Sequence, residues 1–127
     1  MDSDKIKQLL ERLGRTLSAG DLRGVSSCFE VPGLFLSDDG ATVLADASQL
    51  EKLFAQATEW YRARGLVSTK PELERVDVLS QKLAAVDVRW PAFDALGQEK
   101  SSERSHYIVR LGTDGQVYIR VALTRTK

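Results

Sequence analysis

Few side chains in this sequence could carry acid–base, nucleophilic or metal chemistry, and they do not cluster. His106 is the only histidine and Cys28 the only cysteine. A histidine can act as a general base or as a pH-dependent switch. Cys28 directly precedes Phe29, and we expect it to be a small buried side chain rather than a reactive thiol. One histidine and scattered carboxylates do not supply metal ligands at a recognisable spacing. No phosphate loop or dinucleotide fingerprint is present, so the sequence predicts neither a metal nor a cofactor.

Composition excludes several classes of partner. The chain has 127 residues, the size of one domain, and we expect residues 1–127 to form a single domain. Lys and Arg together number 18, as do Asp and Glu, so no net charge attracts nucleic acid or an anionic membrane. The N-terminal residues are charged and helically periodic, with no apolar stretch long enough to span a bilayer. We therefore expect a cytoplasmic protein with no nucleic-acid or membrane partner.

The elements that must position a site begin with three helices. The first has apolar residues at the three-and-four spacing of one helix face, an N-cap at Ser3 or Asp4, and a stop at Gly20. Asp21 can cap a short second helix. The third is the clearest helix and ends at Gly65. Its apolar stripe consists of Leu50, Leu53, Phe54, Ala57, Trp60, Tyr61 and Arg64.

A sheet follows the helices. One short apolar strand is expected at 34–36, and from position 66 onward hydrophobic residues recur every second position, which is typical of strands packed on one face. Gly97 and Asp114–Gly115 mark hairpin turns. Helices followed by a meander predict an α+β fold in which the helices cover one face of the sheet. The predicted strands cover residues 73–79, 83–93, 104–111 and 117–123.

Strand alternation divides the sheet into an inner face, covered by the helices, and an outer face. Pro91 cannot donate a ladder hydrogen bond, so we expect a bulge or a sheet edge at that residue. His106 is expected to point outward, which favours a structural or interfacial role over a catalytic one. The predicted inner face carries Val86, Val88, Trp90, Tyr107, Val109, Leu111, Val117, Ile119, Val121 and Leu123.

The outer face allows two interpretations. Its arginines alternate with aspartates, as on a solvated surface held by weak cross-strand pairs. Arginines interspersed with Ile108, Tyr118 and Ala122 also match the composition of a protein interface. The residues alone leave both interpretations open, and the second would be a homodimer formed through this face. The predicted dimer face consists of Arg89, His106, Arg110, Tyr118 and Arg120.

The order of elements over residues 17–54, LSAGDLRGVSSCFEVPGLFLSDDGATVLADASQLEKLF, resembles the front half of the nuclear transport factor 2-like superfamily. That superfamily includes ketosteroid isomerases and polyketide cyclases. The resemblance implies a cystatin-like cone, in which three N-terminal helices pack on a curved antiparallel sheet, and it also implies dimerisation through the outer sheet face. It implies no single activity, because the fold hosts enzymes, enzyme subunits and binding modules alike.

Two segments resemble ketosteroid isomerase. The run FLSD ends at Asp38, where that family places its carboxylate base, and in HYIVRLGTDG Tyr107 stands at the position of a protonated carboxylic acid. Such a pair would move a proton beside a carbonyl while the phenol donates to the developing oxyanion. The family's second oxyanion donor, a tyrosine of the first helix, corresponds to Leu13. Asp38 also fits a turn, because Ser37, Asp38, Asp39 and Gly40 are turn-forming residues.

Three functions follow from this sequence. The first, which we favour, is a dimeric protein that binds a small apolar molecule in its cone. The second is a cofactor-independent isomerase, cyclase or dehydratase that uses Asp38 and Tyr107. The third is an accessory protein-interaction domain whose cone is filled by side chains. The residues expected to line or rim the cone are Trp60, Tyr61, Trp90, Asp94, Glu103 and Tyr107.

Overall fold

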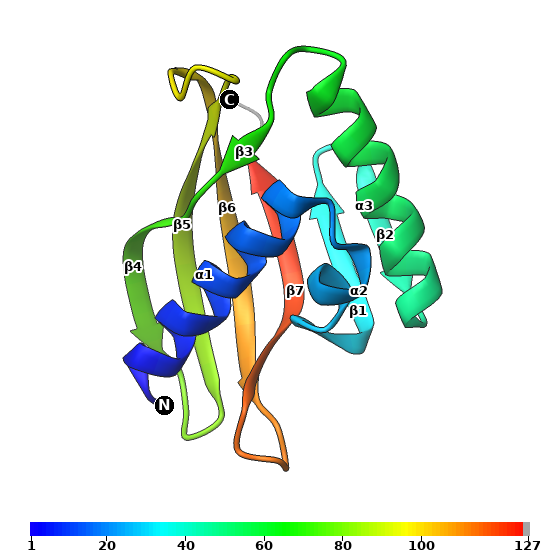
Figure 1. The fold of residues 1–127 in the computed structure, drawn as a ribbon. Coiled ribbons are helices and arrows are strands. Elements are labelled where there is room, and N and C mark those ends of the chain that lie inside the picture. The colour runs from blue at the N-terminus through cyan, green and yellow to red at the C-terminus, as the bar shows by residue number, and fades with distance from the viewer. Residues whose placement is uncertain (126–127) are drawn as a thin grey trace.

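The computed structural model describes residues 1–125, which form three helices packed against a curved, unclosed sheet of seven strands (Figure 1). Helix α1 covers Ser3–Ala19, α2 covers Leu22–Ser26 and α3 covers Ala47–Arg62. In Figure 1, α1 crosses the sheet in front of its central strands, and α3 lies over the strands at one edge. This arrangement confirms the predicted α+β class.

Aspartates begin all three helices. Asp2 caps α1, one or two residues before the predicted cap, while Asp21 caps α2 as predicted and Asp46 caps α3. In each case the side chain accepts a hydrogen bond from a backbone N–H of the first turn, which no helical carbonyl could satisfy. Gly20 ends α1 with φ of +69°, a conformation that side chains disfavour. No helix within residues 1–125 is both long and apolar enough to cross a membrane.

The strands form one mixed sheet in the order β2-β1-β7-β6-β5, with β3 and β4 both paired to the far side of β5. All neighbours are antiparallel except β1 and β7, which run parallel. The predicted sheet was antiparallel throughout, and it lacked β2 and β3, which are too short to show alternation. The strands are β1 (Phe29–Ser37), β2 (Gly40–Leu44), β3 (Ser68–Thr69), β4 (Glu72–Val78), β5 (Leu83–Phe93), β6 (Glu99–Leu111) and β7 (Val117–Arg125).

Pro91 lies opposite a break between two strands. β3 pairs with Ala92 and Phe93, and the pairing of β4 begins at Arg89, so no strand residue on this side needs an N–H from Pro91. On the β6 side the register shifts between Ala92 and Phe93. The expected irregularity is therefore present, one residue beyond the proline.

A bulge in β7 exchanges the two faces of that strand. The predicted alternation holds as far as Ile119, where β7 carries one extra residue, Arg120, relative to β6. An extra residue reverses the face that every following side chain occupies. Ala122 is accordingly buried, whereas Leu123 is exposed. The prediction that Val121 and Leu123 face the helices is therefore wrong, because both lie on the outer face.

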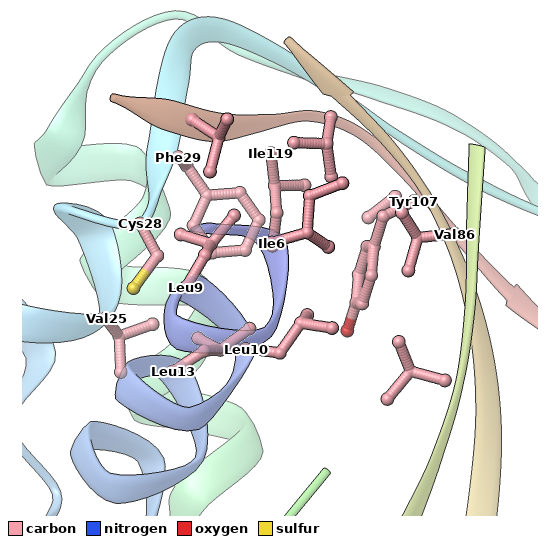
Figure 2. Packing of buried hydrophobic residues seen from close by; sticks show 14 of the residues in the cluster. Ile6, Leu9, Leu10, Leu13, Val25, Cys28, Phe29, Val86, Tyr107 and Ile119 are labelled. Carbon is pink, nitrogen blue, oxygen red and sulfur yellow. The ribbon is translucent and has the colours of Figure 1, made fainter. Parts of the chain in front are cut away.

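The hydrophobic core lies between α1 and the inner face of the sheet. Leu10 and Leu13 of α1 belong to one buried cluster with Val86 and Tyr107 of the sheet (Figure 2). Gly14 permits this close packing, since a Cβ there would lie 2.9 Å from Cδ of Pro71. Cys28 is part of the same core, and burial raises the pKa of its thiol, so it acts as a packing residue.

Candidate functional site

The helices and the inner face of the sheet enclose a cavity of about 280 Å³. Buried side chains such as Leu13, Trp90 and Tyr107 line its inner end, and exposed residues such as Arg62 and Glu103 line its mouth. The walls between them are mainly apolar. They include Leu17, Phe29, Phe35, Leu53, Phe54 and Leu66.

Phe29, Phe35 and Phe54 contact one another on one side of this cavity. Their ring centroids lie 5.4 to 6.0 Å apart in tilted and edge-on arrangements. Phe54 comes from α3 and the other two come from β1, so the contact joins the long helix to the sheet. Aromatic pairs of this kind add to the stability gained by burial. This side of the cavity is therefore a packed apolar wall.

Two tyrosines bring hydroxyl groups into the cavity, and each is bonded to another lining residue. Trp90 Nε1 donates to the Tyr107 hydroxyl at 2.9 Å, deep in the site. At the mouth, the Tyr61 hydroxyl donates to the Glu103 carboxylate, which ties α3 to β6. Because the Tyr107 oxygen already accepts from Trp90, its own proton can be donated to an acceptor in the cavity.

Both tyrosines are held in their neutral form. Burial raises the pKa of Tyr107 to about 12. Burial, followed by the hydrogen bond to Glu103, also raises the pKa of Tyr61. Among residues 1–125, Glu103 is the only carboxylate that lines the cavity and Arg62 the only basic residue. The site therefore combines apolar walls with neutral donors and one charge of each sign.

Four of the predicted site residues come together in this cavity: Tyr61, Trp90, Glu103 and Tyr107. Asp38 does not join them. It lies in the exposed turn between β1 and β2, outside the cavity lining, which corrects its expected position beside Tyr107. Ser37, Asp38, Asp39 and Gly40 therefore connect β1 to β2 in a turn, as their residue types favour.

Trp60 and Asp94 also lie outside the cavity. Trp60 is 50% exposed, and the guanidinium carbon of Arg64 lies 3.6 Å from the centre of its ring. Asp94 accepts hydrogen bonds from the backbone N–H groups of Gln98 and Leu96 in the β5–β6 hairpin, and these bonds lower its pKa. Both predictions therefore placed at the cavity a residue that does not line it.

The α3 residues that line the cavity differ from the predicted stripe. Thr58 and Arg62, which lie outside that stripe, belong to the lining, whereas Trp60 and Arg64 do not. The spacing of Thr58 and Arg62 was a usable signal that they share one face of α3, because residues four apart lie on the same helix face. Ala122 and Thr124 were missed for another reason, the bulge that reverses β7. No grouping of His, Cys, Asp and Glu within the described part of the chain could hold a metal ion.

The outer face of the sheet combines ion pairs with an apolar strip. Arg110 and Arg120 both contact Glu30, and His106 pairs with Asp87. All five residues predicted for this face are half-buried, namely Arg89, His106, Arg110, Tyr118 and Arg120. Between the charges runs a row of successively paired residues from five neighbouring strands, which we call the outer strip: Val43, Leu34, Val121, Ile108 and Ala85.

Comparison with known proteins gives one family match and many similar folds. The model of an NTF2-like protein family, DUF6841, matches residues 3–127. No curated protein matches the sequence.

Among solved structures, a domain of unknown function with a cystatin-like fold from Nostoc punctiforme superposes with a TM-score of 0.79 at 20% identity, covering 99% of this chain and 77% of that one. An NTF2-like protein of unknown function from Shewanella oneidensis gives 0.75 at 17% identity, with 98% of each chain covered. A ketosteroid isomerase-like protein from Erwinia carotovora atroseptica gives 0.72 at 14% identity, covering 95% and 92%. At these identities the similarity shows the fold alone.

Proposed function

Because this chain belongs to the NTF2-like protein family DUF6841, whose fold here surrounds a hollow interior, we propose that it binds a small, mainly apolar molecule between its helices and its sheet. The observation that carries the proposal is the cavity of about 280 Å³ with aromatic and aliphatic walls. Small-molecule sites are concave, largely apolar and supplied with a few polar groups. The volume lies just below the usual range of about 300–1,000 Å³, which favours a compact ligand.

The polar groups of the cavity support binding of a ligand that also carries a hydrogen-bond acceptor. Tyr107 is held in place by Trp90 and keeps a proton to donate, and its raised pKa keeps that proton in place at neutral pH. An acceptor that reached the inner end would satisfy this donor in surroundings with little water, where a hydrogen bond is strong. The position of Asp38 on the surface favours binding over the isomerase reaction that would have used it as a base.

A side chain that fills the cavity is expected to abolish binding without unfolding the protein. Ala57 lines the cavity from α3, whereas its neighbour Gln56 is exposed and does not. We expect Ala57→Phe to occupy the hollow space and Gln56→Phe to act as a matched control. The measurement is a thermal-shift screen of the wild type and both variants with small fatty acids, phenols, ketones, alcohols and amines. A ligand at a hundred times its dissociation constant stabilises by about 2.7 kcal/mol.

Two results would contradict this proposal. One is a wild-type protein whose melting temperature no compound raises. The other is an Ala57→Phe variant that keeps the wild-type response, since binding would then lie elsewhere. Circular dichroism of both variants checks that the fold is intact.

We further propose that two copies associate through the outer sheet face. The outer strip leaves apolar side chains on a surface that no helix covers, and Val43 within it is 65% exposed. The arginines of the flanking ion pairs are half-buried and lie at the rim of the outer strip. An apolar centre with a polar rim is the usual anatomy of a protein interface. A two-fold axis through the strip would place the same residues on both sides.

A charge in the outer strip is expected to dissociate this dimer. Val121 is the central residue of the outer strip, since it pairs with Leu34 on one side and Ile108 on the other. Val121→Glu would bury two carboxylates at the interface of the two chains. Light scattering at micromolar concentration should give about twice the chain mass of 14.1 kDa for the wild type and a monomer for the variant. Val78→Glu is the control, because Val78 pairs with the inner residue Ala84 and is already 58% exposed. A monomeric wild type would contradict the proposal.

A further inference from the structure

Arg62 places a positive charge at the mouth of the cavity. It lies in the last turn of α3, and its guanidinium reaches toward the end of α1, since a Cβ added at Gly20 would lie 3.1 Å from Arg62 Nη2. Thr58 lies one helical turn earlier and lines the same cavity. A guanidinium and a hydroxyl on one helix face can donate together to an anionic group at this mouth.

The two charged groups of the mouth differ in how they are already bonded. Glu103, on β6, accepts a hydrogen bond from the Tyr61 hydroxyl. None of the ion pairs formed among residues 1–125 involves Arg62. A ligand ammonium would have to share Glu103 with Tyr61 while a second cation lies on the same rim. A ligand carboxylate would instead contact Arg62, whose donors can bind both of its oxygens.

Polarity also changes from the mouth to the interior. Arg62 and Glu103 are exposed, whereas the residues below them include Leu17, Phe54 and Leu66. A carboxylate held at the rim keeps contact with water, so its charge escapes the large cost of burial. The apolar body of the same molecule would displace water from the interior. This gradient matches an amphipathic molecule that enters with its apolar end first.

We propose that the ligand is a small monocarboxylate whose head group pairs with Arg62 and Thr58 at the mouth and whose apolar body fills the cavity. This inference rests on the proposed binding function and adds the chemical class of the ligand to it. A second acceptor on the acid that met the Tyr107 hydroxyl at the inner end would add to its affinity, and the contact with Arg62 does not require it. The charge contact sets the preference for an acid, and the apolar walls limit its size.

The test compares three ligands of one chain length: octanoate, octanol and octylamine. Titration calorimetry at neutral pH measures their dissociation constants with the wild type, Arg62→Gln and Arg64→Gln. Arg64 is the matched control, because it lies on the same helix end but stacks on Trp60 outside the cavity. We expect wild type to bind octanoate about tenfold more tightly than octanol, as one charge-assisted hydrogen bond allows. Arg62→Gln should lose that tenfold, and Arg64→Gln should keep it.

The outcomes separate this inference from the function on which it rests. Equal affinity for all three ligands, or a preference for octylamine, would overturn the inference and leave the binding function standing. An equal loss in Arg62→Gln and Arg64→Gln would also overturn it, because the effect would then be one of general surface charge. Binding of none of the three by the wild type would overturn both. Raised salt should weaken octanoate binding and leave octanol binding unchanged.

Discussion

Replacement of Leu13 by alanine is expected to lower the free energy of unfolding by about 2–5 kcal/mol. Leu13 is 1% exposed and belongs both to the core and to the lining of the cavity. The truncation removes buried methyl groups and leaves a void that α1 and the sheet cannot close completely. The void adjoins the existing cavity, so the change enlarges the site as well as destabilising the fold.

Urea unfolding measures the loss of stability, and binding of carboxylates of increasing chain length measures the larger cavity. We expect the best-bound chain to be longer for Leu13→Ala than for the wild type. The control is Leu96→Ala in the β5–β6 hairpin, because Leu96 is 84% exposed and its truncation should change the unfolding free energy by less than about 0.5 kcal/mol. A similar loss in both variants would contradict the assignment of Leu13 to the core.

Alkaline pH is expected to destabilise the protein through Tyr107. Its pKa of about 12 in the folded protein lies above the value of about 10 for an exposed tyrosine. Below pH 10 the Tyr107 phenol is neutral in both the folded and the unfolded protein, so its full contribution to the free energy of unfolding is present. Above pH 10 the unfolded chain ionises first, and the contribution is lost as pH rises through the folded pKa. The loss should reach roughly 1 kcal/mol at pH 11 and about 2–3 kcal/mol beyond pH 12.

The measurement is urea unfolding at pH 9 and pH 11 for the wild type and Tyr107→Phe. The variant cannot ionise at this position, so its stability should fall less over the same interval, although it starts lower because Trp90 Nε1 loses its acceptor. Tyr118→Phe is the control, since Tyr118 lies on the outer face and the loss due to Tyr107 should persist without it. Equal declines in the wild type and Tyr107→Phe would show that Tyr107 does not control the alkaline loss.

The fold could be predicted from the sequence because its main elements have strong periodic patterns. The α1 leucines and the alternation of β5 each agree with the packing they form, and the family match confirms the resemblance seen in residues 17–54. The parallel pairing of β1 with β7 could not be predicted, since it joins segments about ninety residues apart and no local pattern records which strands become neighbours. β2 lacked a signal because four of its five residues are exposed.

The site was predicted less completely, for two physical reasons. Trp90 and Tyr107 lie on regular strands, so alternation placed both correctly on the inner face. Ala122 was misplaced because a single extra residue at Arg120 reverses the strand, and nothing in the local sequence marks that bulge. Trp60 was misplaced because it was counted in the apolar stripe of α3, whereas it lies against Arg64 at the surface. Arg62 was overlooked because a charged residue on a helix is usually solvated.

The parallel contact between β1 and β7 also affects synthesis of the protein. The β1–β2 hairpin leaves the ribosome well before its inner neighbour β7, which is the last strand of this sheet in sequence order. Until Val117–Arg125 has been translated, an edge of β1 stays open to pairing with other chains. The sheet can be completed only after β7 has left the ribosome, so a stop codon before position 117 would leave a nascent chain prone to aggregation rather than a smaller stable domain.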